Sequence, residues 1–157
     1  KIYFYASVFP ALKKLQKAGF LFILVTNKSG IGRGYFTVQQ FQAVNAAFLR
    51  LLRKNDVRIS GVYYCPHHPD AGCGCRKPKP GMVHRAAREN GIDLRRSFVV
   101  GDQVGDLNLA RNLKIPGVLV LTGSGAITRC KAAGIPTKIT SNMGTAAAWI
   151  LSQSLFR

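Results

Sequence analysis

The sequence predicts an α/β fold with a mostly parallel sheet. Segments whose apolar residues recur at helical spacing alternate with short apolar runs along the chain, and this rhythm is typical of parallel strands joined by helices. The run from Phe20 to Val25 is continuous, as in a strand buried on both faces. The 157 residues suffice for one domain, so residues 1–157 are expected to form a single domain.

In the first half of the chain, Val8, Leu12 and Leu15 predict a helix, which Gly19 is expected to end. The run from Phe20 to Val25 then predicts a strand. The remaining elements of this half are a helix opened by the capping box Thr37-x-x-Gln40 and carrying Phe41, Val44, Phe48, Leu51 and Leu52, a strand from Val57 to Tyr64, and a helix from Met82 to Glu89 ended by Asn90-Gly91.

The second half repeats the pattern. We expect a strand from Ser97 to Val100, a helix from Leu107 to Asn112, strands from Val118 to Leu121 and from Thr137 to Thr140, and a closing helix through Trp149. Ligands of such sheets bind beyond the carboxyl ends of the strands. The loops that follow Val25, Tyr64, Val100 and Leu121 are therefore the places to look for chemistry. No clear buried strand precedes the first helix, although sheets of this type usually have one at their centre.

The charge is extreme: 23 Lys and Arg face six Asp and Glu, for a net charge of +17. Such a balance favours an anionic partner, which could be a nucleic acid, a membrane surface or a phosphorylated metabolite. The basic residues are scattered and do not alternate with aromatic residues as in a groove for single strands. The longest apolar run, Phe20 to Val25, is far shorter than the roughly 20 residues of a membrane helix.

Three thiols and an imidazole lie close together in the segment from Cys65 to Cys75. Zn²⁺ prefers four such ligands in a tetrahedron, and a complete set leaves no open position, which indicates a structural ion. The candidate ligands are Cys65, His67, Cys73 and Cys75, with His68 as the alternative imidazole. A disulfide or free thiols are the competing interpretations. The fourth cysteine, Cys130, is expected to be a buried thiol.

Two further segments suit phosphate. Arg76 and Lys77 directly follow the last of the three thiols, and a guanidinium and an ammonium bind phosphate oxygens well. Thr26-Asn27-Lys28-Ser29-Gly30 follows the first predicted strand and offers a hydroxyl and several N–H groups. The alternatives are a solvated basic loop and an ordinary turn.

Two carboxylates follow the strand that ends at Val100. Gly101-Asp102 and Asp106 suit Mg²⁺, a hard cation that takes oxygen ligands. Asp106 would equally fit the first turn of a helix.

Together these segments resemble the haloacid-dehalogenase phosphatases, and within them the sugar bisphosphate phosphatases that carry a zinc loop. The resemblance rests on Thr-Asn-Lys-Ser-Gly, Cys-Pro-His-His-Pro, Cys-x-Cys-Arg-Lys-Pro and Gly-Asp-x-x-x-Asp, in this order along nearly the whole chain. It implies a three-layer α/β sandwich with a zinc-stabilised loop. It also implies a cytoplasmic, monomeric enzyme of lipopolysaccharide-core sugar metabolism that acts on a small phosphorylated sugar, without a nucleic-acid or membrane partner.

The resemblance also implies roles for single residues. Thr26 and Lys77 would stabilise the transferred phosphoryl group, while Asp102 would hold Mg²⁺ and the four Cys and His ligands would hold Zn²⁺. The reaction would pass through an aspartyl-phosphate. The residues expected to contact substrate are Thr26, Asn27, Lys28, Ser29, Arg76, Lys77 and Gln103.

The chain departs from the family pattern in two respects. Lys28 stands where the family usually has Gln, and Gln103 where Lys is common. The family's Asp-x-Asp-Gly-Thr motif, with the nucleophile and the general acid, belongs on a strand before Lys1 and does not occur in these 157 residues. The 157-residue chain by itself is therefore expected to release no phosphate.

Two other functions compete with the phosphatase. A non-catalytic relative would keep the zinc and phosphate sites and bind ligand without turnover. A basic, nucleic-acid-binding zinc protein would account for the charge, and its affinity would fall steeply with salt. Several ordered motifs outweigh a diffuse charge, so the phosphatase is preferred.

Overall fold

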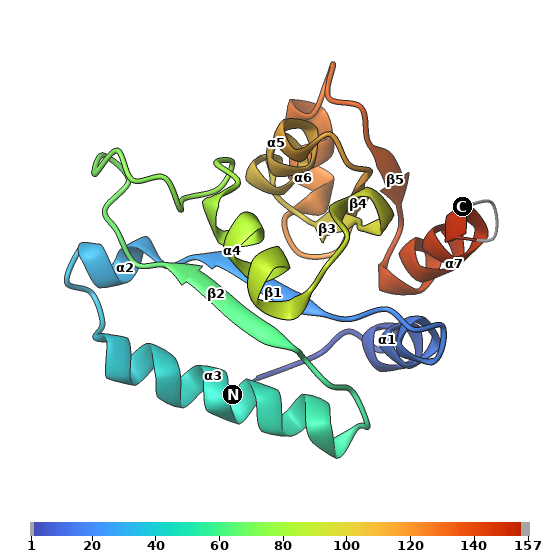
Figure 1. The fold of residues 1–157 in the computed structure, drawn as a ribbon, viewed down its shortest axis with the longest axis horizontal. Coiled ribbons are helices and arrows are strands. Elements are labelled where there is room, and N and C mark those ends of the chain that lie inside the picture. The colour runs from blue at the N-terminus through green and yellow to red at the C-terminus, as the bar shows by residue number, and fades with distance from the viewer. Residues whose placement is uncertain (1, 155–157) are drawn as a thin grey trace.

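The computed structural model describes residues 2–154, in which helices and strands alternate (Figure 1). The strands are β1 (Ile23–Asn27), β2 (Gly61–Cys65), β3 (Val99–Gly101), β4 (Gly117–Val120) and β5 (Lys138–Thr140). The helices are α1 (Val8–Lys17), α2 (Ser29–Gly32), α3 (Val38–Lys54), α4 (Gly81–Asn90), α5 (Val104–Leu113), α6 (Gly125–Lys131) and α7 (Met143–Ser154), with a 3₁₀ turn at Leu94–Arg96.

The strands form two parallel sheets. β1 pairs with β2, starting with Ile23 opposite Gly61, and β3, β4 and β5 pair in that order. Every pair of strands in the described residues is parallel, which confirms the predicted α/β class. No hydrogen-bonded ladder joins β1 to β3 within residues 2–154.

Helices cover both faces of the three-stranded sheet. Val118 of β4 belongs to a buried cluster with Leu15 of α1 and Ile150 of α7. Side chains alternate between the two faces of a strand. The preceding residue, Gly117, is therefore on the opposite face, and a Cβ there would contact Ala110 of α5. The sheet therefore lies between α1 and α7 on one side and α5 on the other. Figure 1 shows α1 and α7 side by side and α3 along the β1–β2 pair.

Helix ends follow the local sequence. Thr37 and Gln40 form the predicted capping box, since Gln40 N donates to Thr37 Oγ1 and Thr37 N donates to Gln40 Oε1. Gly91 ends α4 with φ at 63°, a conformation that glycine adopts without strain.

Some predicted boundaries are wrong. β1 begins at Ile23 rather than Phe20, and β2 begins at Gly61 rather than Val57. Neither α2 nor α6 was predicted, because both are short and contain glycines that weaken the helical signal. The prediction that the first strand is buried on both faces is also wrong: all five residues of β1 are half-buried, because β1 borders an open cavity.

In the described part of the chain, no helix has the length and apolar character needed to cross a membrane.

Candidate active site and metal centre

The four predicted zinc ligands come together after β2. The Cys65 sulfur lies 3.5 Å from both His67 Nδ1 and the Cys73 sulfur, and the Cys75 sulfur lies 3.2 Å from His67 Nδ1 and 3.5 Å from the Cys73 sulfur. All four ligand atoms lie within 4.8 Å of one another. Bonds of roughly 2.0–2.3 Å from a central Zn²⁺ fit a set with this spacing, so the donor set suits the ion.

The second imidazole points elsewhere. Nδ1 of His68 lies 3.3 Å from Asp70 Oδ2 and accepts a hydrogen bond from Asp70 N. The fold therefore brings His67, and not His68, together with the three cysteines.

Two thiols of the cluster differ in acidity. Burial acts to raise the pKa of Cys73, but hydrogen bonds from the Arg76 N–H and the neighbouring thiols outweigh it and lower this pKa to about 6. Burial and the same neighbouring sulfurs raise the pKa of Cys75 to about 12. A cation is needed to hold both sulfurs as thiolates at neutral pH, because thiolates repel one another without one.

The prediction that Cys130 is a buried thiol is wrong. Cys130 is exposed rather than buried. It lies on α6, whose buried positions are Gly125 and Thr128, so the sulfur is on the outward face of that helix.

The end of β1 is bound to the loop after the cysteines. Asn27 Nδ2 donates to Lys77 O at 3.1 Å, and Lys77 N donates to Asn27 Oδ1 at 3.0 Å. The Asn27 amide thus holds the main chain of Lys77 at both ends, which gives it a structural task beside the predicted contact with substrate. Thr26 is the preceding residue of β1, and Lys28 and Ser29 lead into α2.

The Lys77 side chain lies at the carboxyl edge of β1. Its ammonium donates to Val25 O at 2.9 Å and to Asp106 Oδ1 at 2.6 Å. The side chains of Lys77 and Asp106 are only 15% and 10% exposed. In this setting an ion pair fixes the position of the ammonium, because a buried charge is costly without its partner.

Asp106 has a role that sequence reasoning left open. It lies in the first turn of α5, and its Oδ2 accepts a hydrogen bond from Gln103 N at 3.2 Å. With one oxygen on the helix start and the other on Lys77, Asp106 is a positioning residue. The spacing of the two acids in Gly-Asp-x-x-x-Asp was the only signal of it in the sequence.

Gly101 keeps room for this carboxylate, and substitution there provides a test. A Cβ at position 101 would collide with the Asp106 carboxylate, whereas a Cβ at Gly105 would meet nothing within 4 Å. We expect Gly101→Ala to displace Asp106 and Lys77 and to lower the melting temperature by several degrees, at a cost of roughly 1–3 kcal/mol. Thermal unfolding of both variants checks this: Gly105→Ala should unfold at the wild-type temperature or above. Equal melting temperatures would contradict the assigned contact.

Arg76 directly precedes Lys77 in the chain. Its Nη1 is buried and has no hydrogen-bond partner among the described residues. Buried polar atoms in native proteins are nearly always paired. A buried Nη1 without a partner, on the residue that precedes Lys77, favours an anion as its partner.

Asp102 follows β3 and is held by the loop after β4. Its Oδ2 accepts from Ser124 N at 2.8 Å, and Gln103 Nε2 lies 3.5 Å from Ser124 Oγ. A Cβ at Gly123 would come within 2.5 Å of Asp102 Oδ2, so a glycine is needed for this close approach. One carboxylate oxygen is thus fixed, and the other can serve as a ligand.

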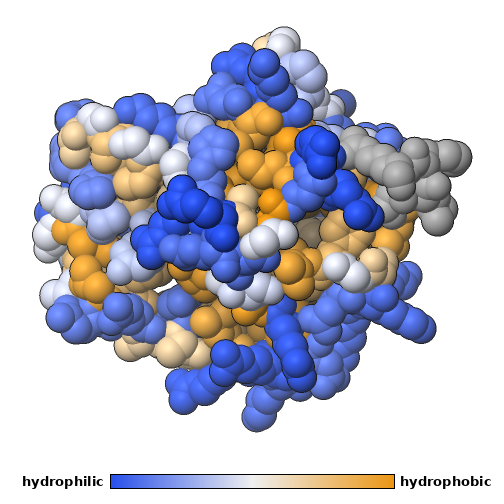
Figure 2. Space-filling model, viewed as in Figure 1, coloured by the Kyte–Doolittle hydropathy of each residue, from blue (hydrophilic) through white to orange (hydrophobic). Residues whose placement is uncertain are grey.

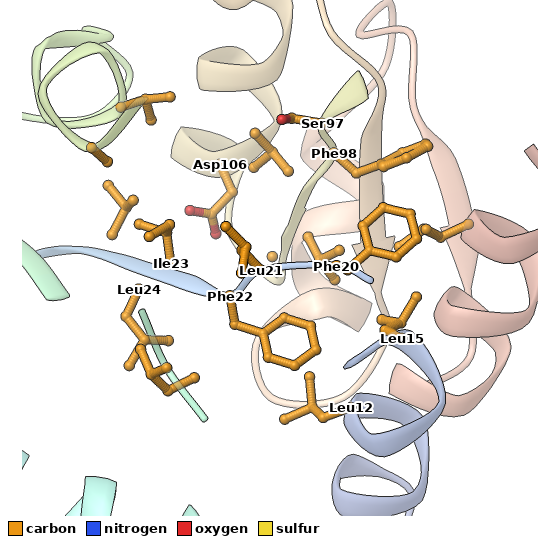
Figure 3. Close-up of a pocket in the computed structure, with 18 of the residues that line it drawn as sticks. Leu12, Leu15, Phe20, Leu21, Phe22, Ile23, Leu24, Ser97, Phe98 and Asp106 are labelled. Carbon is orange, nitrogen blue, oxygen red and sulfur yellow. The ribbon is translucent and has the colours of Figure 1, made fainter. Parts of the chain in front are cut away.

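A cavity of about 1070 Å³ lies beside these residues. Its lining includes Lys77, Asp102 and Asp106, together with most of β1 and β3 and side chains of α1. Figure 3 shows that carbon atoms dominate the lining, with the Asp106 carboxylate among the few polar groups. The charged residues Lys77, Asp102 and Asp106 therefore border a largely apolar space.

A family model described as HAD-hydrolase-like matches residues 74–146. The D-glycero-beta-D-manno-heptose-1,7-bisphosphate 7-phosphatase of Pseudomonas aeruginosa is 38% identical over 145 residues, which cover 92% of this chain and 82% of that protein. The enzyme of the same name from Haemophilus influenzae is 43% identical over 127 residues, which cover 76% of this chain and 69% of that enzyme.

Solved structures agree with these relatives. The D,D-heptose 1,7-bisphosphate phosphatase of B. bronchiseptica, complexed with magnesium and phosphate, has a TM-score of 0.86 at 32% identity and covers 95% of this chain and 84% of its own. The corresponding phosphatase from Burkholderia thailandensis has a TM-score of 0.72 at 29% identity, and the match covers 94% of this chain and 86% of that phosphatase.

Proposed function

Since the chain belongs to the HAD-like hydrolase family, among the heptose bisphosphate phosphatases, we propose that it is a phosphoric monoester hydrolase. Its substrate in this proposal is D-glycero-D-manno-heptose 1,7-bisphosphate, from which it removes the phosphate on C7. It acts as a monomer on this small sugar phosphate and not on a nucleic acid.

The observation that carries the proposal is the buried Nη1 of Arg76, which has no hydrogen-bond partner among the described residues. Arg76 lies next in the chain to Lys77, whose ammonium is fixed at the carboxyl edge of β1. A bisphosphate brings two multiply charged groups, and a guanidinium binds phosphate oxygens through parallel hydrogen bonds. The positions of Arg76 and Lys77 support binding of such a substrate.

In this proposal the residues of the chain have separate roles in stabilising charge, positioning Lys77 and binding substrate. Lys77 stabilises negative charge on the transferred phosphoryl group, and the Thr26 hydroxyl donates to one of its oxygens. Asn27 positions Lys77 through its main chain, and Asp106 positions the ammonium. Arg76 binds the substrate, and Lys28, Ser29 and Gln103 are further substrate contacts in this proposal.

The donor set at Asp102 fits Mg²⁺. Proteins often bind this ion through one or two carboxylates together with substrate phosphates and water, and Asp102 keeps one oxygen for it. Bound there, Mg²⁺ would neutralise charge on the phosphoryl oxygens. Asp102 is the residue that would hold it.

The proposed displacement uses an aspartate as the nucleophile. Its carboxylate oxygen bonds to phosphorus while the bond from phosphorus to the sugar oxygen breaks, and the departing oxygen takes a proton from a general acid. Water then splits the aspartyl-phosphate into inorganic phosphate and the free aspartate. The resemblance assigns the nucleophile to an Asp-x-Asp-Gly-Thr motif that does not occur in these 157 residues, so in this proposal none of their aspartates attacks phosphorus.

The test is phosphate release from D-glycero-D-manno-heptose 1,7-bisphosphate by the protein in its full encoded length, with Zn²⁺ and Mg²⁺ present. We expect turnover that stops on removal of Mg²⁺, with ³¹P NMR showing that the C7 phosphate is lost and the C1 phosphate is kept. The 157-residue chain alone should bind the bisphosphate without releasing phosphate. If the protein in its full encoded length bound the bisphosphate without turnover, it would instead be a non-catalytic relative.

A further inference from the structure

The loop between β4 and α6 holds Asp102, and Tyr5 holds this loop. Ser124 N donates to Asp102 Oδ2 at 2.8 Å, and the N–H of the preceding residue, Gly123, donates to the hydroxyl oxygen of Tyr5 at 3.1 Å. Tyr5 and Gly123 are 118 residues apart in the sequence. The phenol of Tyr5 is therefore connected to the carboxylate of Asp102 through two successive main-chain N–H groups.

Gly123 brings the main chain of the loop directly against this carboxylate. Its φ is 63°, and a Cβ there would come within 2.5 Å of Asp102 Oδ2. A shift of Gly123 would therefore change the direction in which Ser124 N points. Because a hydrogen bond weakens steeply as its angle departs from linear, such a shift would leave the carboxylate of Asp102 free to rotate.

The flanking residues of the loop are fixed by other elements. Leu121 N donates to Thr140 O of β5, and Gly125 N donates to Thr122 O at the start of α6. Neither contact involves the N–H of Gly123, whose partner among the described residues is the Tyr5 hydroxyl. Tyr5 therefore fixes the middle of the loop, where Asp102 is bound.

Tyr5 is itself held in place just before α1. Its carbonyl oxygen accepts a hydrogen bond from Val8 N. The ring of the neighbouring Phe4 packs on Phe9 of α1 and Phe48 of α3, with ring centroids 4.7 and 5.3 Å apart. A tyrosine side chain has only two main torsions, so a fixed main chain places its hydroxyl at a low cost in entropy.

The surroundings of Tyr5 are mostly apolar. Tyr5 lines the cavity of about 1070 Å³ together with Gly123 and Asp102. Carbon atoms dominate the lining in Figure 3, and Figure 2 shows hydrophobic side chains gathered near the centre of one face, with hydrophilic ones around them. Apolar side chains offer no acceptor to an N–H group, so these neighbours cannot replace the phenolic oxygen.

We propose that Tyr5 is a positioning residue for Asp102, the residue that holds Mg²⁺ in the proposed function. Its hydroxyl fixes Gly123, which directs Ser124 N at Asp102 Oδ2 and leaves Oδ1 free to serve as the ligand. Removal of a group that orients a metal ligand typically weakens metal binding roughly 10–100-fold. The inference rests on the magnesium site of the proposed function.

Tyr5→Phe tests this inference, because it removes the hydroxyl and keeps the ring. The protein in its full encoded length, loaded with Zn²⁺, is titrated with Mn²⁺, which takes the same oxygen ligands as Mg²⁺. Free Mn²⁺ is measured by electron paramagnetic resonance. Tyr5 acts through the main chain and not on the ligand itself, so we expect the dissociation constant to rise about 3–10-fold, at or below the lower end of the range for direct partners.

Two further readouts separate positioning from a general structural role. Before Mn²⁺ is added, the amides of Gly123 and Ser124 should exchange several-fold faster in Tyr5→Phe, because one hydrogen bond is lost. The Mg²⁺ concentration for half-maximal phosphate release should rise with the dissociation constant. In contrast, kcat at saturating Mg²⁺ should stay within about a factor of two of the wild type.

The matched control is Tyr35→Phe, because Tyr35 is 74% exposed and follows α2; it should bind Mn²⁺ as the wild type does. Asp102→Asn should lose the ion. If Asp102→Asn lost it while Tyr5→Phe bound it as tightly as the wild type, the inference would be overturned and the proposed function would stand. If Asp102→Asn kept the wild-type affinity, the magnesium site would be wrong, and the role given to Tyr5 would be wrong with it.

Discussion

Lys77→Met is expected to lower kcat for phosphate release by about 10²–10³-fold. The substitution removes an ammonium that Val25 O and Asp106 hold at the carboxyl edge of β1, and the loss of one fixed group that stabilises transition-state charge has an effect of this size. It also leaves the carboxylate of Asp106, which is only 10% exposed in its side chain, without its ion-pair partner. We therefore expect a lower melting temperature as well, from a loss of roughly 3–5 kcal/mol.

The measurement is steady-state phosphate release by the protein in its full encoded length, at a temperature well below the melting temperature of the variant. Lys54→Met is the matched control, because Lys54 is an exposed residue at the end of α3. Its kcat should stay within a factor of two of the wild type. If Lys77→Met kept more than a third of the wild-type kcat, Lys77 would have a structural role only.

Replacing one of the zinc ligands is expected to remove the metal and disorder the loop between β2 and α4. Cys65, His67, Cys73 and Cys75 meet within 4.8 Å, and three ligands bind zinc far more weakly than a closed set of four. Arg76 and Lys77 directly follow Cys75, so loss of the metal should also release both cations. We expect His67→Ala to lose bound zinc and to lower kcat/KM at least tenfold.

Zinc content per chain and the melting temperature measure this outcome, and the chain offers two controls. His68→Ala should keep one zinc ion, because the His68 imidazole contacts Asp70 instead. Cys130→Ser should do the same, because Cys130 is exposed on α6. A zinc ion kept by His67→Ala but lost by His68→Ala would show that the second imidazole is the ligand.

Local patterns were enough to predict most of the elements. The apolar stripe and the capping box at Thr37 predicted α3, and Gly91 marked the end of α4, because helix signals depend on neighbours a few residues apart. The Cys/His cluster was also predictable, since all four of its residues lie in the segment from Cys65 to Cys75. The order of motifs along the chain was likewise enough to place it in its family.

Other features depend on residues far apart in the sequence. Lys77 and Asp106 are 29 residues apart, and they meet because Asn27 binds the main chain of Lys77 to the end of β1. Exposure of Cys130 depends on which face α6 turns to β4, and the local pattern of so short a helix does not define that face.

The sequence by itself determined the alternation of strands and helices, the Cys/His cluster and the basic segments proposed to bind phosphate, because each depends on residues that are close along the chain. The tertiary structure alone decided that Asp106 holds Lys77 and that β1 and β3 line one cavity. The physical reason is that hydrogen bonds between strands and ion pairs across a sheet depend on register and direction, which are set when the helices pack against the strands.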